Sequence, residues 1–315
     1  MKSPQDGPRA SVVVATHNRP ELLRTLLEAI RAQSMTDFQL VVVDDGSDDT
    51  TPNVAALADV VVRTDHVGPA RARQAGWQVT DGPIIAFTDD DCRPQSQWLE
   101  RLVETLEQGD AGLAQGRTVP RSDQADRHGP WSRTQHIETE SGFYQTCNIA
   151  YTRTALEAVG GFHPAFSGPR TSGEDTDLAW RVKEQGYRSV FVAEAVVEHE
   201  VWPSSYAAFL KDRPRWGMVV LTLRHHPQLR RLAYRRYFYR PSHARALAGL
   251  GVIGLAAAWH PWLAPTLCAG AATLYVGRGP SRPKRLVHLG QVALADLYEL
   301  AVFVVASARY RTVLL

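Results

Sequence analysis

The chain is predicted to be an α/β protein with a mostly parallel sheet flanked by helices, and three observations lead to this fold class. Short β-branched runs alternate with stretches of helical apolar spacing between residues 10 and 200. Polar and acidic turns follow several of the runs directly, which is where open α/β sheets bind ligands. The length of 315 residues and an apolar share of 44% allow one large domain with a smaller appendage.

The elements follow in order from this pattern. A first strand is expected at 11–15 (SVVVA), and Pro20 opens a helix whose apolar residues recur at helical spacing. The further strands are expected at 39–43, 60–63, 83–88, 146–151 and 189–197. The further helices are expected to begin near Thr51 and Glu174 and to cover 70–79, 97–107 and 152–159. The polar stretch 119–142 is expected to form a long functional loop.

Acidic residues gather at the ends of two of these strands. The second strand ends in Asp44 and Asp45, and the fourth delivers Asp89, Asp90 and Asp91. Adjacent carboxylates repel each other, and a divalent cation relieves the repulsion. Mg²⁺ and Mn²⁺ bind carboxylate and phosphate oxygens, so an Asp-x-Asp pair can hold such an ion on a nucleotide diphosphate. The alternative is an ordinary solvated turn of aspartates.

The order of the polar motifs resembles that of the family-2 glycosyltransferases, which have the GT-A (nucleotide-diphospho-sugar transferase) fold. The resemblance covers about residues 10–200, with Gln74 in a place where the family usually has Asn. The matching residues are Thr16, Asn18 and Arg19; Asp44 to Ser47; Gly68, Ala72 and Arg73; Asp89 and Asp91; Asn148; Gly161 and Phe162; Glu174 and Asp175; and His199.

This resemblance implies an inverting transfer of a sugar from a UDP-, GDP- or dTDP-sugar to an acceptor hydroxyl. Asp175 is then the catalytic base, and Asp91 and His199 bind Mn²⁺ or Mg²⁺. The implied donor-binding residues are Thr16, Asn18, Arg19, Asp44, Asp45, Arg73, Asp89 and Asp90. The implied acceptor-side residues are Asn148, Glu174 and Trp216. Without the family pattern, Glu174 and Asp175 are an acidic first helical turn, and His199 is a packed histidine.

The net charge, the cysteine count and the first residues limit the expected partners and cellular environment. A net charge of +2 gives no reason to expect a nucleic-acid partner. Three distant cysteines form neither a disulfide framework nor a metal-binding cluster in the sequence, which fits a reducing, cytosolic environment. Residues 1–9 are expected to be a disordered lead-in without a secretory signal.

The composition changes after the transferase domain, which is expected to span 10–210. A basic, aromatic segment follows at 211–245, and apolar or amphipathic helices are expected at 246–315. The apolar run 246–277 is long enough to enter a membrane, and its basic flanks favour a hairpin that returns to the cytosol. This predicts a protein at the cytoplasmic face of the cell membrane, with a lipid-linked or envelope-glycan acceptor. The alternative is a soluble, cytoplasmic protein with a helical appendage.

Other interpretations carry less weight. Gly249, Gly251 and Gly254 spell a dinucleotide-binding pattern, but no strand precedes them, so close packing in a helix is expected instead. Arg215 and Trp216 lack the Gln three residues before Arg215 that processive relatives carry, which argues against polymer synthesis. A nucleotidyltransferase and a non-catalytic membrane adaptor remain as alternatives. The former is disfavoured because no glycine-rich loop follows the first strand.

Overall fold

The computed structural model describes residues 7–109, 111–259 and 284–315, and it divides into two compact units. The first unit ends at Ser204 and the second begins at Ser205. The first unit contains the sheet and nearly all of the predicted site, whereas the second contains helices only among its described residues. Each unit has its own packing.

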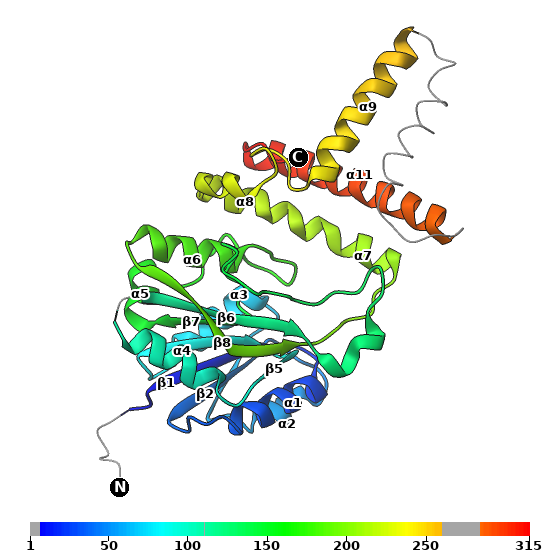
Figure 1. The fold of residues 1–315 in the computed structure, drawn as a ribbon. Coiled ribbons are helices and arrows are strands. Elements are labelled where there is room, and N and C mark those ends of the chain that lie inside the picture. Colours follow the sequence, from blue (N-terminus) through cyan, green and yellow to red (C-terminus); the bar gives the residue numbers. More distant parts are fainter. Residues whose placement is uncertain (1–6, 110, 260–283) are drawn as a thin grey trace. The chain divides into compact units, whose positions relative to one another are not determined.

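The first unit is built on an eight-stranded sheet with the order β3-β2-β1-β4-β7-β6-β8-β5 (Figure 1). The strands are β1 (Ala10–Thr16), β2 (Phe38–Asp44), β3 (Val60–Arg63), β4 (Ile84–Asp89), β5 (Cys92–Pro94), β6 (Ala111–Pro120), β7 (Asn148–Thr152) and β8 (Arg188–His199). The helices are α1 (Pro20–Arg31), α2 (Thr51–Ala55), α3 (Pro69–Trp77), α4 (Trp98–Glu107), the 3₁₀ helix η1 (Ser122–Arg127), α5 (Arg153–Val159) and α6 (Glu174–Glu184).

The parallel half of the sheet brings the predicted acidic turns together. β1 pairs in parallel with both β2 and β4, with Thr16 opposite Asp44 and Ala15 opposite Asp89. The carboxyl ends of these central strands therefore lie at one edge. This confirms the α/β fold class, to which the second half of the sheet adds antiparallel pairs between β7 and its neighbours β4 and β6.

Two strands, β5 and β6, are not among the predicted elements. β6 has the sequence AGLAQGRTVP, in which two glycines and Gln115 hide the β-branched pattern. A Cβ atom at Gly116 would lie 2.3 Å from Oδ1 of Asn148, so this position of the strand accepts only glycine. β5 has three residues, too few for any periodicity to show.

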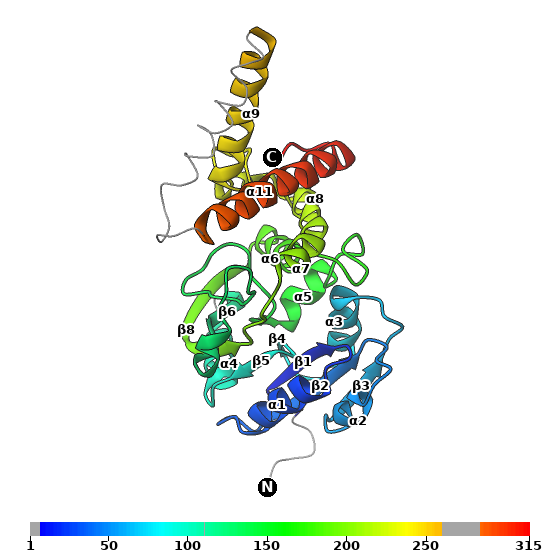
Figure 2. The same ribbon diagram turned by 90° about the vertical axis from the view of Figure 1, so that its right-hand side faces the viewer.

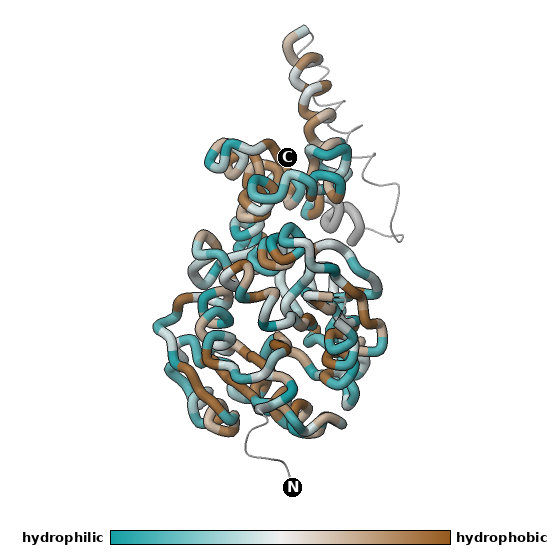
Figure 3. Tube along the Cα trace, turned by 90° about the vertical axis from the view of Figure 1, so that its left-hand side faces the viewer, coloured by the Kyte–Doolittle hydropathy of each residue, from teal (hydrophilic) through white to brown (hydrophobic). Residues whose placement is uncertain are grey.

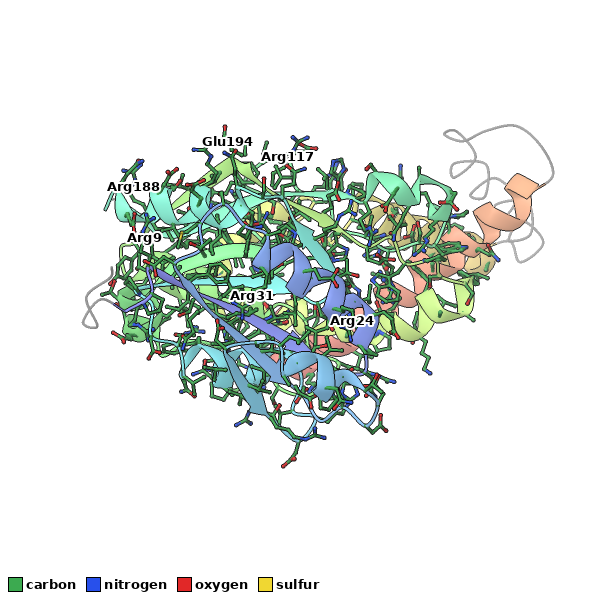
Figure 4. The ribbon with its side chains drawn as sticks, turned by 90° about the horizontal axis from the view of Figure 1, so that it is seen from below. Arg9, Arg24, Arg31, Arg117, Arg188 and Glu194 are labelled. Carbon is green, nitrogen blue, oxygen red and sulfur yellow. The ribbon has the colours of Figure 1, made fainter. Side chains whose placement is uncertain are left out.

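The helices cover the two faces of the sheet with different contacts. α1, α2 and α4 pack on the face that displays Val12, Val14 and Val42, where the largest apolar cluster lies. α3 packs on the other face through Gly76, whose Cβ position is 2.6 Å from Val13 and 2.7 Å from Val43 (Figure 2). Figure 4 labels six charged side chains of this unit, of which Arg24 and Arg31 lie over α1: Arg9, Arg24, Arg31, Arg117, Arg188 and Glu194.

The second unit is helical in its described part. It comprises α7 (Tyr206–Asp212), η2 (Arg213–Gly217), α8 (Met218–His225), η3 (Pro227–Leu232), α9 (Pro241–Trp259) and α11 (Lys284–Tyr310). α11 packs against η2, α8 and α9. Glu299 of α11 accepts hydrogen bonds from Arg213 at 3.0 Å and from Nε2 of His243 at 3.3 Å, so a buried polar cluster joins these elements.

α9 carries the first part of the predicted apolar run. It exposes large apolar side chains, including Leu255 at 68% and Trp259 at 80% exposure. Figure 3 colours much of this helix as hydrophobic. Residues 260–283 lie outside the described residues, so the expected hairpin stays a prediction. The Gly-x-Gly-x-x-Gly pattern lies within this helix, and no described atom comes within 4 Å of a Cβ built on any of its three glycines. The structure therefore offers neither a phosphate-binding turn nor the expected close packing among its described residues.

Candidate active site

The turn between β1 and α1 is fixed to the neighbouring loop. Asn18 has a positive φ of 53°, which asparagine tolerates better than most residues. Its backbone N–H donates to Oγ of Ser47 at 2.9 Å, and its side-chain oxygen accepts from the N–H of Asp48 at 3.0 Å. The Asn18 side chain therefore holds the turn in place through Oδ1, and its predicted contact with the donor stays a prediction.

Asp44 is buried and is held by its own surroundings. One carboxylate oxygen accepts from the N–H of Ser47 at 3.0 Å, and the other accepts from Arg63 at 2.7 Å. Arg63 also donates to the Ser47 carbonyl at 2.8 Å. Asp44 therefore closes the turn that follows β2.

Asp45 fixes the loop that leads into α3. Its carboxylate accepts from Oγ1 of Thr64 at 2.6 Å and from the N–H groups of Val67 and Gly68, both at 2.8 Å. Gly68 has a φ of 92° and caps α3. Asp45 is 5% exposed, so only a small part of it is accessible to a bound sugar donor.

Asp90 is the most enclosed member of the triple aspartate. Oγ1 of Thr16 donates to it at 2.8 Å, and Arg19 donates to its other oxygen at 2.7 Å. Burial raises the pKa of Asp90 to about 6, against the opposing charge of Arg19, and the charge of Asp91 adds to the rise. Asp90 therefore connects the turn after β1 to the acidic turn after β4. It does so through Thr16 and Arg19, which were both predicted to contact the sugar donor.

Asp91 and His199 face each other, and their geometry suits a cation. Nδ1 of His199 lies 2.9 Å from the Glu200 carbonyl, which can only accept, so Nδ1 carries the proton. In the neutral ring Nε2 then presents a lone pair, and it lies 3.6 Å from Oδ1 of Asp91. Two acceptors that face each other across this gap match a divalent ion between them. Mn²⁺ or Mg²⁺ therefore fits these residues.

Trp202, which the sequence did not predict, orients Asp91 through the carboxylate oxygen that does not face His199. Its indole N–H donates to Oδ2 of Asp91 at 2.8 Å, and this leaves Oδ1 directed at His199. The ring of Trp202 also lies 5.0 Å from the Arg19 guanidinium. Trp202 and Asp91 are 111 residues apart, so no sequence spacing could link them.

Arg73 joins Asp89 to the start of α6. It donates to Oδ1 of Asp89 at 2.6 Å, and its Nη1 lies 3.7 Å from Glu174. The side chain is buried, yet Nε and Nη1 have no hydrogen-bond partner among the described residues. Buried guanidinium donors normally find acceptors, so this group is suited to an anionic part of a substrate.

Asp175 stands in the first turn of α6 with few partners. Among the described residues only Thr176 donates to it, through its N–H at 2.8 Å, while the Thr176 hydroxyl donates to the Phe143 carbonyl at 2.7 Å. Burial raises the pKa of Asp175 to about 7, and the nearby charges of Glu174 and Asp89 add to the rise against Arg73. A carboxylate with a pKa close to neutrality can accept a proton from a hydroxyl.

The predicted functional loop 119–142 has a firm base. Glu200, which follows the β8 residue His199, accepts from Arg121 at 3.1 Å, from Gln124 at 2.7 Å and from Arg127 at 2.6 Å. This buried carboxylate holds η1 against the strand end that carries His199. The sequence did not predict a role for Glu200, whose only signal was its place directly after the predicted metal ligand His199.

Two predicted acceptor-side residues, Asn148 and Trp216, make contacts inside their own units. Asn148 is fully buried: its amide donates to the carbonyls of Arg117 at 2.7 Å and Ala195 at 2.9 Å, and its oxygen accepts from Trp98 at 2.8 Å. All its polar atoms are thus used inside the fold, so the acceptor-side prediction for Asn148 is corrected to a structural role. Trp216 belongs to η2 of the second unit and packs against Tyr239, and its contact with an acceptor stays a prediction.

Comparison with known proteins identifies related glycosyltransferases. Residues 11–166 match the family model for glycosyl transferase family 2. The glycosyltransferase AglE of Haloferax volcanii is 28% identical over 225 residues, which are 67% of this chain and 72% of AglE. The glucosyl-dolichyl phosphate glucuronosyltransferase of the same organism is 26% identical over 219 residues, covering 62% of this chain and 70% of that protein.

A solved structure supports the fold. The mannosyltransferase PcManGT from Pyrobaculum calidifontis, in complex with GDP-Man and Mn²⁺, superposes with a TM-score of 0.57 at 22% identity, covering 98% of this chain and 88% of that chain. The likeness extends to the arrangement of the sheet and its helices, which is that of GT-A transferases. The chain belongs to glycosyl transferase family 2 and is a glycosyltransferase with the GT-A fold.

Proposed function

We propose that this glycosyltransferase is metal-dependent and inverting, with a nucleotide-diphosphate sugar as its donor. The observation that carries the proposal is Asp175, a sparsely hydrogen-bonded carboxylate whose pKa is raised to about 7 beside the Arg73–Asp89 pair. Few hydrogen bonds of the fold depend on this carboxylate, and it is suited to accept the proton of a hydroxyl.

In the proposed reaction Asp175 accepts the proton of the acceptor hydroxyl. The hydroxyl oxygen forms a bond to the anomeric carbon while the bond from that carbon to the diphosphate oxygen breaks, and the nucleoside diphosphate leaves with the electron pair. Attack from the side opposite the leaving group inverts the anomeric configuration. Such base assistance contributes about 10² to 10⁴ in rate.

The leaving diphosphate is proposed to lie beside Asp91 and His199, which would hold Mn²⁺ or Mg²⁺ between them. A bound divalent ion neutralises charge on a departing diphosphate, which typically stabilises a transition state by several kcal/mol. Trp202 donates to one Asp91 oxygen, so the other, which faces His199, would be left to bind the ion. The Mn²⁺ in the PcManGT complex supports this assignment.

The donor is proposed to bind along the edge formed by β1, β2 and β4. Arg73 and Asp89 would meet the sugar and phosphate, because the two unpartnered donors of Arg73 are the buried polar atoms that an anionic ligand would satisfy. Asp44, Asp45 and Thr16 would shape the nucleoside pocket through the turns they hold. A UDP-, GDP- or dTDP-sugar fits this description equally.

The acceptor is proposed to be a hydroxyl of a lipid-linked or envelope glycan at the cytoplasmic face of a membrane. Three observations support this: the exposed apolar side chains of α9, one described helical segment of suitable length and apolarity to cross a membrane (Gly290–Tyr310), and the dolichyl-phosphate substrate in the name of a relative.

A donor screen tests the transfer proposal. Wild-type protein is incubated with UDP-, GDP- and dTDP-sugars, with Mn²⁺, with Mg²⁺ or with a chelator, and release of nucleoside diphosphate is measured. One donor class should be hydrolysed or transferred only with metal, and Asp91→Asn should abolish the release. Metal-independent release at the wild-type rate in Asp91→Asn would refute the metal assignment.

A vesicle assay tests the membrane proposal separately. Trp259→Glu in α9 should lower co-sedimentation with anionic lipid vesicles, because it places a charge in the exposed apolar surface. Val61→Glu is the matched control, since Val61 is exposed at 45% but lies on β3 of the first unit. Equal sedimentation of the three proteins would refute the role of α9.

A further inference from the structure

Cys92 lies beside the Asp91–His199 pair, and no step of the proposed transfer uses it. One ligand atom from each of the three residues can be chosen so that all lie within 4.8 Å of one another. Cys92 begins β5 and is the register partner of His199 on β8 in an antiparallel pair, so both side chains stand on the same face of the sheet. The short β5 strand thus fixes the thiol next to the imidazole.

The thiol and the imidazole are both enclosed, and Sγ of Cys92 also lies 3.8 Å from the carbonyl oxygen of Cys147. Cys92 is 3% exposed and His199 is 7% exposed. Nε2 of His199 receives no hydrogen bond from any described residue, and its lone pair faces Oδ1 of Asp91. A buried imidazole nitrogen without a donor, aimed at a carboxylate with a thiol alongside, is a ligand set rather than an ordinary packing arrangement.

The chemistry of the three ligands differs from what the transfer reaction needs. Mn²⁺ and Mg²⁺ prefer oxygen ligands in six-coordinate geometry, and two protein ligands leave the remaining positions to diphosphate oxygens and water. Zn²⁺ and Cd²⁺ bind thiolate strongly, and Zn²⁺ with three protein ligands commonly keeps a single open position. The same pocket therefore offers one ligand set to hard ions and a larger one to thiophilic ions.

We propose that Cys92 makes this centre a capture site for thiophilic divalent ions such as Zn²⁺, which bind through Asp91, Cys92 and His199 and compete with the ion used in transfer. The thiol proton passes to solvent when the sulfur binds. Transfer is inhibited because the captured ion has too few open positions to chelate a diphosphate. This inference rests on the proposed role of Asp91 and His199 in metal binding.

The binding test uses Cd²⁺ on the full-length protein, because sulfur bound to Cd²⁺ absorbs in the ultraviolet. Titration of the wild type should produce this charge-transfer band at one ion per chain, and Cys92→Ser should remove it and weaken Cd²⁺ binding by at least about 10-fold. Cys147→Ser is the matched control: Cys147 is also buried, but its thiol lies 3.7 Å from Oγ1 of Thr118 and belongs to no such ligand group among the described residues. Cys268→Ser controls for the thiol outside the described residues.

Two further measurements separate the possible failures. Mn²⁺ binding is followed by electron paramagnetic resonance, and Zn²⁺ should displace the bound Mn²⁺ at lower concentration in the wild type than in Cys92→Ser. If Mn²⁺ binds but the sulfur band is absent, or persists in Cys92→Ser, the Cys92 inference is wrong and the metal site stands. If Mn²⁺ fails to bind even with nucleoside diphosphate present, the proposed metal site itself is wrong.

Discussion

Two pairs of adjacent carboxylates in the first unit have opposite surroundings. Asp44 ends β2 and Asp45 follows it, and the two accept hydrogen bonds from backbone N–H groups, a threonine hydroxyl and Arg63. Asp175, beside Glu174 at the start of α6, accepts only from its neighbour Thr176 among the described residues and has a pKa raised to about 7. One pair is satisfied by the fold, whereas the other keeps an oxygen available for chemistry.

The difference shows how a GT-A domain assigns two tasks to one residue type. Carboxylates that accept several hydrogen bonds from the fold hold loops in place. Carboxylates that are buried with few donors hold a destabilised charge, which is the state a general base needs. Asp91 is intermediate: Trp202 binds one of its oxygens, and the other faces His199. Substitutions of these residues and their partners test whether hydrogen bonding separates the carboxylates in this way.

The largest effect is expected for Asp175→Asn. Loss of the base should lower kcat by about 10² to 10⁴. In the wild type kcat/KM should rise with pH through an apparent pKa near 7, because only the deprotonated carboxylate accepts a proton. This rise should be absent from the residual activity of the variant. A variant that keeps the wild-type rate and pH profile would remove Asp175 from the mechanism.

The same substitution should also stabilise the protein in a pH-dependent way. The folded-state pKa of Asp175 lies above the ordinary value of 3.8, so ionisation opposes folding. The penalty is absent below about pH 4, grows as the pH rises and is complete above about pH 7. Thermal melts should therefore show a higher Tm for Asp175→Asn at pH 8 and no gain at pH 4. A lower Tm at pH 8 would contradict this interpretation.

Asp45→Ala should act in the opposite direction. It leaves the N–H groups of Val67 and Gly68 without their acceptor, and each such loss costs about 1–3 kcal/mol. The free energy of unfolding, measured in urea, should fall by about 3 kcal/mol. A variant of unchanged stability that no longer binds donor would make Asp45 a direct donor contact instead of a loop anchor.

Trp202→Phe should have a smaller effect, confined to the metal site. It keeps an aromatic ring beside Arg19 but removes the indole donor to Asp91. Loss of such an outer hydrogen bond typically lowers metal affinity by about 10-fold or more. Mn²⁺ titration should show this loss with little change in Tm. Unchanged Mn²⁺ affinity would mean that Asp91 needs no help from Trp202.

The smallest effect is expected for Arg63→Met. Arg63 donates to Asp44 at 2.7 Å, but its side chain is 57% exposed and water can replace it. The free energy of unfolding should fall by no more than about 1 kcal/mol. A loss as large as that of Asp45→Ala would show that the satisfied pair depends on a surface ion pair.

The sequence predicts the parallel half of the sheet because runs such as 40–43 and 84–88 are continuous and apolar. It does not predict β6, whose glycines serve a contact with Asn148 that is visible only in three dimensions. It identifies Asp91, Asp175 and His199 through the order of family motifs, and their proposed roles stay predictions. It misses Trp202 and Glu200, because their partners are remote in sequence and their own neighbours carry no motif.

The anchoring of η1 by Glu200 has a consequence for redesign of the loop 119–142, which is predicted to be functional. Three side chains from 121–127 converge on that carboxylate, whereas residues 128–130 are exposed. The loop thus has a fixed base and a tip that carries little of the fold. Exchange of the tip between relatives should be tolerated, and replacement of Arg121 or Arg127 should not. Redesign of this loop can therefore begin at 128–130 without disturbing the strand that carries His199.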